Sequence, residues 1–86
     1  MSVGIETSSN VTVTDVVRRI LEARAIAQPV QSHDDLREAG LTSLDMVSLV
    51  LSVESEFDVK IPERDITPTN FRSIATIEIL VARLQR

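Results

Sequence analysis

The 86-residue chain has a net charge of -4, with 43% apolar residues, 26% charged residues, two Gly and three Pro. This composition is typical of one small helical domain rather than of a disordered segment. The absence of Cys excludes disulfides and thiolate chemistry, and two Phe with no Trp or Tyr provide no platform for nucleic-acid bases. No segment could span a membrane, so we expect a cytoplasmic protein that binds neither membranes nor nucleic acid.

Residues 1–10 are polar and aperiodic, and we expect them to be a flexible tail that precedes a folded domain over residues 11–86. A first helix is indicated by apolar residues three and four positions apart, namely Val13, Val16, Val17, Ile20 and Leu21. Thr12 and Asp15 form a capping box at its start. We expect this helix to end near Ala27, because Pro29 disfavours helical geometry in the residue before it.

A connection over residues 28–42 follows, which is long for a compact domain. Residues 34–40 could form a short helical turn that ends at Gly40 in a left-handed conformation. Leu36 and Leu41 are the apolar residues expected to hold this segment against the core.

The next helix is predicted to begin at Ser43 and to run to about Phe57. Its apolar residues form two separate lines. One line is expected to face the core and contains Met46, Leu49, Val50, Val53 and Phe57. The other is expected to be partly exposed and contains Leu44, Val47 and Leu51.

Acidic residues accompany the second line. From Ser43 to Val59 the chain carries four carboxylates and no Lys or Arg, while the rest of the chain has equal numbers of acids and bases. An apolar strip bordered by one sign of charge is typical of a transient docking surface for a partner with basic residues. The residues predicted for partner recognition are Leu44, Asp45, Val47, Leu51, Glu54 and Glu56.

Two further elements complete the chain. Residues 66–71 suggest a short helical turn with Pro68 at its first position. Ser73 is expected to cap a last helix, with a positive charge from Arg83 and Arg86 at its carboxyl end, and its buried face consists of Ile74, Ile77, Leu80, Val81 and Leu84. Without a convincing strand pattern, the predicted fold is all-α, a small bundle of three longer helices with one or two short ones.

Little in the sequence indicates catalysis. His33 is the only histidine and lies in the long connection beside Asp34, where a solvated residue is more common than a catalytic base. The acids near it do not continue into a calcium loop, and no glycine-rich phosphate loop occurs, so we expect no catalytic residue and no metal site. Ser43 remains as a candidate, and a plain helix cap is the simplest interpretation of a serine at that position.

The surroundings of Ser43 add a second interpretation. The segment LREAGLTSLDMVSLVLSVESEFDVKIPERDITPTNFRSIATIEILVARL, residues 36–84, resembles the acyl carrier protein family. The positions that match the family's residue types are Leu36, Gly40, Leu41, Ser43, Leu44, Val47, Leu49, Val50, Glu54, Phe57, Ile61 and Pro62.

The resemblance implies a non-enzymatic, monomeric carrier. It implies that a phosphopantetheinyl transferase moves 4′-phosphopantetheine from coenzyme A onto Ser43. The thiol of that arm would hold an acyl or aminoacyl group as a thioester, loaded by an acyl- or amino acid-activating ligase and passed to downstream transferases. The helix over residues 43–57 would be the recognition helix.

The match departs from carriers of fatty-acid synthesis at three positions. Those carriers typically read Asp-Ser-Leu at the attachment site, whereas Thr42 precedes Ser43 here, and Ser48 and Ser55 replace residues that are often Glu. These differences favour a specialised discrete carrier, such as one that accepts an amino acid from a stand-alone ligase.

Two alternatives remain open from the sequence. In the first, the protein is a helical interaction module in which Ser43 is only a cap. In the second, Ser43 and His33 belong to a small hydrolase.

Overall fold

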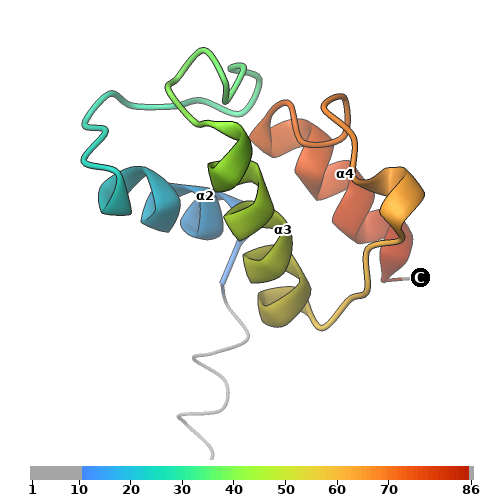
Figure 1. Ribbon diagram of the computed structural model, residues 1–86. Helices are drawn as coiled ribbons and strands as arrows, with labels where there is room; N and C mark the ends of the chain where they lie inside the picture. Colours follow the sequence, from blue (N-terminus) through green and yellow to red (C-terminus); the bar gives the residue numbers. More distant parts are fainter. Residues whose placement is uncertain (1–10, 86) are drawn as a thin grey trace, which may run out of the picture.

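The computed structural model describes residues 11–85, so the predicted tail over residues 1–10 and the terminal Arg86 lie outside the described residues. It contains helices α2 (Val13–Ala23), α3 (Ser43–Phe57) and α4 (Ile74–Leu84), with a 3-10 turn η1 (Glu63–Asp65), as Figure 1 shows. The predicted all-α fold is confirmed over the described residues. No helix among them is long and apolar enough to cross a bilayer.

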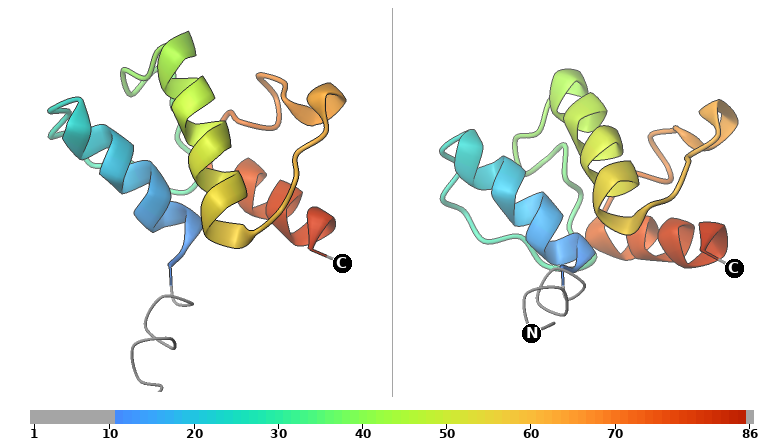
Figure 2. Two further views of the ribbon diagram at one scale, coloured as in Figure 1. Left: turned by 60° about the horizontal axis from the view of Figure 1, so that its bottom comes forward. Right: turned by 90° about the horizontal axis from the view of Figure 1, so that it is seen from below.

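The three α-helices enclose one core. Helices α2 and α3 lie side by side and run in opposite directions, and α4 runs across them (Figure 2), with contacts from α2 to both α3 and α4. Each helix contributes the apolar face predicted from its spacing. The fully buried side chains with the largest volumes are Leu36, Leu49, Ile77, Leu80, Val16, Val17 and Val53.

Helix α2 ends four residues before the predicted end at Ala27. Ala25 adopts φ 57°, and its amide donates to the carbonyl of Glu22 (3.0 Å) while the amide of Ile26 donates to the carbonyl of Leu21 (2.9 Å). These two bonds form a Schellman motif, which terminates a helix through one left-handed residue. The chain therefore leaves the helix through hydrogen bonding at Ala25, and not because of Pro29.

The connection between α2 and α3 is held at both of the predicted apolar residues, since Leu36 and Leu41 are buried. The amide of Leu36 donates to the carbonyl of Arg72 (2.8 Å), which ties the connection to the start of α4. Gly40 has φ +117°, as predicted for the end of this turn. A Cβ at that position would lie 3.2 Å from the side chain of Ile26, so Gly40 also lets the connection approach the segment just after α2 closely.

Two short turns lie between α3 and α4, and only the second was predicted. The first is η1, which follows Pro62, and the amide of Asp65 donates to the carbonyl of Pro62 (2.8 Å). The second is the predicted turn with Pro68 at its first position: the amide of Phe71 donates to the carbonyl of Thr67 (3.1 Å), and the Thr67 hydroxyl accepts from the amide of Asn70 (3.1 Å). Thr67 thus caps this turn as an N-cap residue does.

Candidate functional site

At the start of α3, the neighbouring hydroxyls of Thr42 and Ser43 have different roles. Thr42 is the N-cap: its hydroxyl accepts from the amide of Asp45 (3.3 Å), and the Asp45 carboxylate accepts from the amide of Thr42 (2.7 Å). Ser43 is the first residue of the helix and is exposed. The prediction that Ser43 caps the helix is therefore wrong, because the threonine one residue earlier has the required extended conformation and fills that role.

The side chain of Asp45 is held in place by several hydrogen bonds. Its carboxylate accepts from the amide and hydroxyl of Thr42 and from the guanidinium of Arg24 at the end of α2. The hydrogen bond from the Thr42 amide is the main cause that holds the pKa of Asp45 below its ordinary value, and Arg24 adds to this effect while burial opposes it. Asp45 is only 7% exposed, so its predicted place on a docking surface is corrected.

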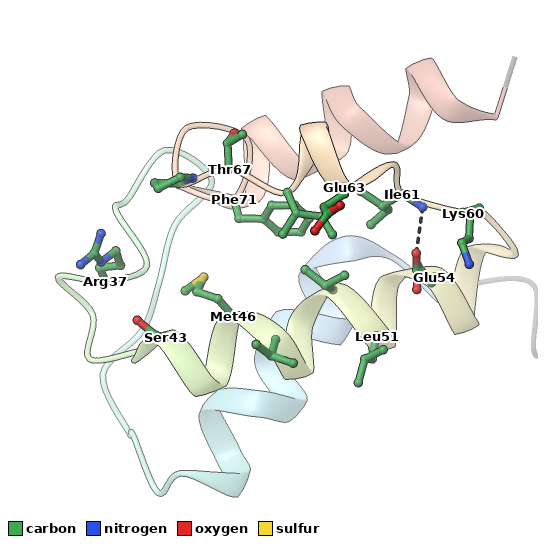
Figure 3. A pocket seen from close by; sticks show the side chains of 14 residues that line it. Arg37, Ser43, Met46, Leu51, Glu54, Lys60, Ile61, Glu63, Thr67 and Phe71 are labelled. Atoms are coloured by element: carbon green, nitrogen blue, oxygen red, sulfur yellow. Dashed lines mark hydrogen bonds between the residues drawn. The ribbon is translucent and has the colours of Figure 1, made fainter.

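Ser43 lies at one end of a groove with a volume of about 640 Å³, which we call the α3 groove. Figure 3 shows Arg37 and Ser43 at one end and Lys60 at the other. The walls come from α3 on one side and from the chain between α3 and α4 on the other. The lining residues are Arg37, Ser43, Met46, Val47, Val50, Leu51, Glu54, Lys60, Ile61, Glu63, Ile66, Thr67, Pro68 and Phe71.

The apolar line predicted to be partly exposed is strongly exposed. Leu44, Val47 and Leu51 have exposures of 79%, 56% and 61%, and two of them reach the rim of the α3 groove. Burying such side chains against a partner would remove apolar surface from water, which favours association.

The two acids predicted beside this line have internal partners. The carboxylate of Glu54 accepts from the amide of Ile61 (2.8 Å), and that of Glu56 accepts from Arg19 (3.2 Å). Glu54 is half-buried and closes the far end of the groove, whereas Glu56 is exposed. Glu54 therefore contributes negative charge on the groove side of α3, whereas Glu56 pairs with Arg19 of α2.

His33 is exposed in the connection before α3 and is absent from the groove lining around Ser43. Its neighbour Asp34 accepts from the amide of Gln31 (2.9 Å). Within residues 11–85 no group of three His, Asp or Glu side chains is placed to bind a metal ion together. The structure thus does not bring His33 and Ser43 into one site.

This region also contains two arginines, Arg24 and Arg37, that were not predicted from the sequence to belong to the site. Arg24 pairs with Asp45, and Arg37 lines the groove with Ser43. Both contacts depend on how the connection folds back between α2 and α3, for which a single sequence provides no signal. The only related feature of the sequence is that the basic residue Arg37 lies shortly before Ser43.

These residues suit a phosphate ester on Ser43. The hydroxyl is exposed, and the amides of Ser43 and Leu44 lie in the first turn, where an α-helix provides no internal acceptor. The positive end of the helix dipole and the guanidinium of Arg37 favour an anion there. The apolar lining of the groove could receive a chain attached at this point.

Comparison with known proteins agrees with this chemistry. Residues 11–84 match the family described as "Phosphopantetheine attachment site". The chain belongs to this family of carrier proteins, which hold acyl or aminoacyl groups as thioesters on a covalently bound 4′-phosphopantetheine arm. The resemblance read from residues 36–84 is thereby confirmed.

The similar proteins are specialised carriers. Aminoacyl carrier protein 1 of Bradyrhizobium diazoefficiens is 50% identical over 66 residues, which cover 77% of this chain and 73% of that protein. Aminoacyl carrier protein 2 of the same organism is 44% identical over 69 residues, 80% of this chain and 78% of that protein.

Two solved structures support the same assignment. A chain in the crystal structure of Bradyrhizobium japonicum glycine:[carrier protein] ligase with its cognate carrier protein and an analogue of glycyl adenylate superimposes with a TM-score of 0.75. It is 42% identical, with 83% of this chain and 91% of that chain covered. A chain in the complex of the ligase with glycylated carrier protein has a TM-score of 0.73 and 43% identity, with 79% and 90% covered.

Proposed function

We propose that Ser43 is the attachment point of the arm and that this protein carries an aminoacyl group loaded by an amino acid:[carrier protein] ligase. The observation that supports it best is the exposed hydroxyl of Ser43 at the first position of α3, beside Arg37 and at the end of an apolar groove. The arm supplies a thiol, which this chain lacks.

The chemistry at Ser43 needs no base from this chain. The serine oxygen would form the phosphodiester with the phosphorus of the phosphopantetheine half of coenzyme A. The adenosine bisphosphate half would leave, and the hydroxyl proton would pass to the transferase. Ser43 needs only to be accessible, which its exposure and the separate capping by Thr42 allow. We therefore propose a protein without catalytic residues.

An aminoacyl cargo is supported by the relatives. Three of them are named aminoacyl carrier proteins, and the similar solved chains come from complexes with a ligase that acts on glycine. We infer a small amino acid such as glycine as the cargo. The loading enzyme selects the amino acid, so the sequence of the carrier determines which ligase binds and thereby which cargo arrives.

The docking surface proposed for the ligase is the strip Leu44, Val47 and Leu51, with the carboxylates of Glu54 and Glu56 at one end. Exposed apolar side chains would supply the contact, and the carboxylates would attract a partner with basic residues before contact forms. A contact of this size suits a carrier that must leave one enzyme for the next.

Intact-mass spectrometry in two stages tests the proposal. Incubation with coenzyme A and a broad-specificity phosphopantetheinyl transferase should add the mass of one phosphopantetheine to the wild type and to Ser48→Ala, but not to Ser43→Ala. Further incubation with ATP, glycine and a glycine:[carrier protein] ligase should then add one glycyl group. A carrier that gains the arm but accepts an acyl group and no amino acid would contradict the aminoacyl assignment alone.

A further inference from the structure

Arg37 is a cation on a fixed backbone at the Ser43 end of the α3 groove (Figure 3). Its amide donates to the carboxylate of Asp35 (2.9 Å), and its carbonyl accepts from the amide of Gly40 (3.1 Å). The preceding Leu36 is buried in the core. The loop is therefore held in place while the side chain of Arg37 remains exposed.

The guanidinium of Arg37 has no ion-pair partner among residues 11–85. Ion pairs within that part of the chain use other arginines: Arg18, Arg19, Arg24, Arg72 and Arg83. Of the acids close to Arg37 in sequence, Asp35 has other contacts, since it pairs with Arg72 and accepts from the Arg37 amide. The adjacent Glu38 is exposed and forms no ion pair with a described residue. An arginine held at a groove without a carboxylate partner is available to an anion that arrives there.

The residues that flank Ser43 place no competing negative charge beside Arg37. Thr42 is neutral, and the carboxylate of Asp45 is occupied by Thr42 and Arg24. An aspartate at position 42 would put a carboxylate next to the modified serine and repel a phosphate there. The replacement by threonine thus makes the surroundings of Ser43 more favourable to an anion.

We propose that Arg37 binds the phosphodiester of the arm attached to Ser43, together with the free amides at the start of α3. The inference rests on the proposed attachment to Ser43. Arginine can donate two parallel hydrogen bonds to two phosphate oxygens, which would fix the orientation of the phosphate as well as its position. Arg37 is then a positioning residue that directs the first part of the arm toward the groove.

The test compares apo and holo forms of the wild type, Arg37→Ala, Arg37→Lys and the control Arg64→Ala. Arg64 is exposed, forms no ion pair with a described residue, and does not line the groove. Phosphorus NMR of the holo proteins reports the surroundings of the phosphodiester directly. Thermal unfolding of each apo and holo pair reports whether the arm stabilises the fold.

We expect the phosphorus resonance to move in Arg37→Ala, to move less in Arg37→Lys, and to be unchanged in Arg64→Ala. The holo form of the wild type should unfold at a higher temperature than the apo form at low ionic strength. This difference should shrink in Arg37→Ala, and also in the wild type at about 1 M salt, where the screening length is about 3 Å.

Unchanged phosphorus resonance and unchanged holo-apo difference in Arg37→Ala would overturn the inference while leaving attachment to Ser43 intact. Failure of the wild type to gain the arm at Ser43 would overturn both proposals. If Arg37→Ala does not fold, the wild type still decides the matter. In that case the Nε–H resonance of Arg37 must move between the apo and holo forms.

Discussion

The hydroxyls of Thr42 and Ser43 are one residue apart, yet the helix uses only that of Thr42. Thr42→Ala should lower the free energy of unfolding by about 1 kcal/mol, because the amide of Asp45 loses its acceptor. Ser43→Ala should change it by less than about 0.5 kcal/mol, as is usual for exposed residues without a structural role. Denaturant unfolding of the two apo variants measures both values.

A comparison of these two variants distinguishes a residue that stabilises the helix from the residue that carries the arm. Thr42→Ala should still gain the arm, whereas Ser43→Ala should be stable and unmodified. A large loss of stability in Ser43→Ala would instead indicate that Ser43 caps the helix.

Asp45 gives the protein an acid-sensitive contact between α2 and α3. Its folded pKa lies below the ordinary value of 3.8, so its contribution to stability is present above that pH and is lost as the pH falls through the folded pKa. Asp45→Asn should therefore unfold at a lower temperature at pH 7, and its stability should fall less steeply than that of the wild type between about pH 4 and pH 2.

The matched control is Glu38→Gln, since Glu38 is exposed and forms no ion pair within residues 11–85. Its acid unfolding should follow that of the wild type. Parallel curves for Asp45→Asn and the wild type would show that the contact with Arg24 and Thr42 contributes nothing that depends on the charge.

At the scale of elements, the end of α2 contains a residue in an unfavourable conformation. Ala25 has φ 57°, which L-residues other than Asn, Asp and Gly rarely adopt. Ala25→Gly should raise the free energy of unfolding by roughly 0.5–1 kcal/mol, because the relief of this strain exceeds the added entropy of the unfolded chain.

Ala23→Gly provides a control two residues earlier, inside α2. Here glycine should lower stability, since the backbone is helical and glycine is a poor helix former. The same substitution thus has opposite signs at the two positions. Destabilisation by Ala25→Gly would contradict the Schellman geometry that ends the helix.

Helix α3 is also the element that partners should recognise. Leu51→Asp should lower kcat/KM for loading by the ligase by a factor of roughly 10 to 100, equivalent to the ~1.5–3 kcal/mol that burial of a Leu side chain contributes. The fold should persist, because Leu51 is 61% exposed.

Ile79→Asp on α4 is the control for that experiment, with a similar exposure of 66% and a position outside the α3 groove. It should be loaded at the rate of the wild type. Equal losses in the two variants would mean that the strip on α3 is not the docking surface.

At the scale of the whole molecule, the predictable features were those with a strong local signal. Helical spacing identified the buried faces of all three helices, and α3 begins at Ser43 and ends near Phe57 as predicted. The capping box of Thr12 with Asp15 and the cap at Ser73 were also predicted correctly. In each case side chains within one or two turns determine the result.

Features that depend on distant residues were missed. The burial of Asp45 requires Arg24, which lies 21 residues earlier, and the groove requires the chain after α3 to fold back along it. The cap of α3 was assigned one residue late, because Thr and Ser are both good caps and only the backbone distinguishes them. Ser43, the proposed attachment residue, could nevertheless be selected from the sequence, since the residues that match the carrier family surround it.

Tandem mass spectrometry of the holo protein is the most direct test of attachment of the arm to Ser43. Trypsin should release residues 38–60 as one peptide, cut after Arg37 and Lys60, which contains Thr42 and the serines Ser43, Ser48, Ser52 and Ser55. If Ser43 carries the arm, fragment ions should place the whole added mass on Ser43. Added mass on another residue, or a peptide without added mass after complete incubation with coenzyme A and a transferase, would contradict attachment to Ser43.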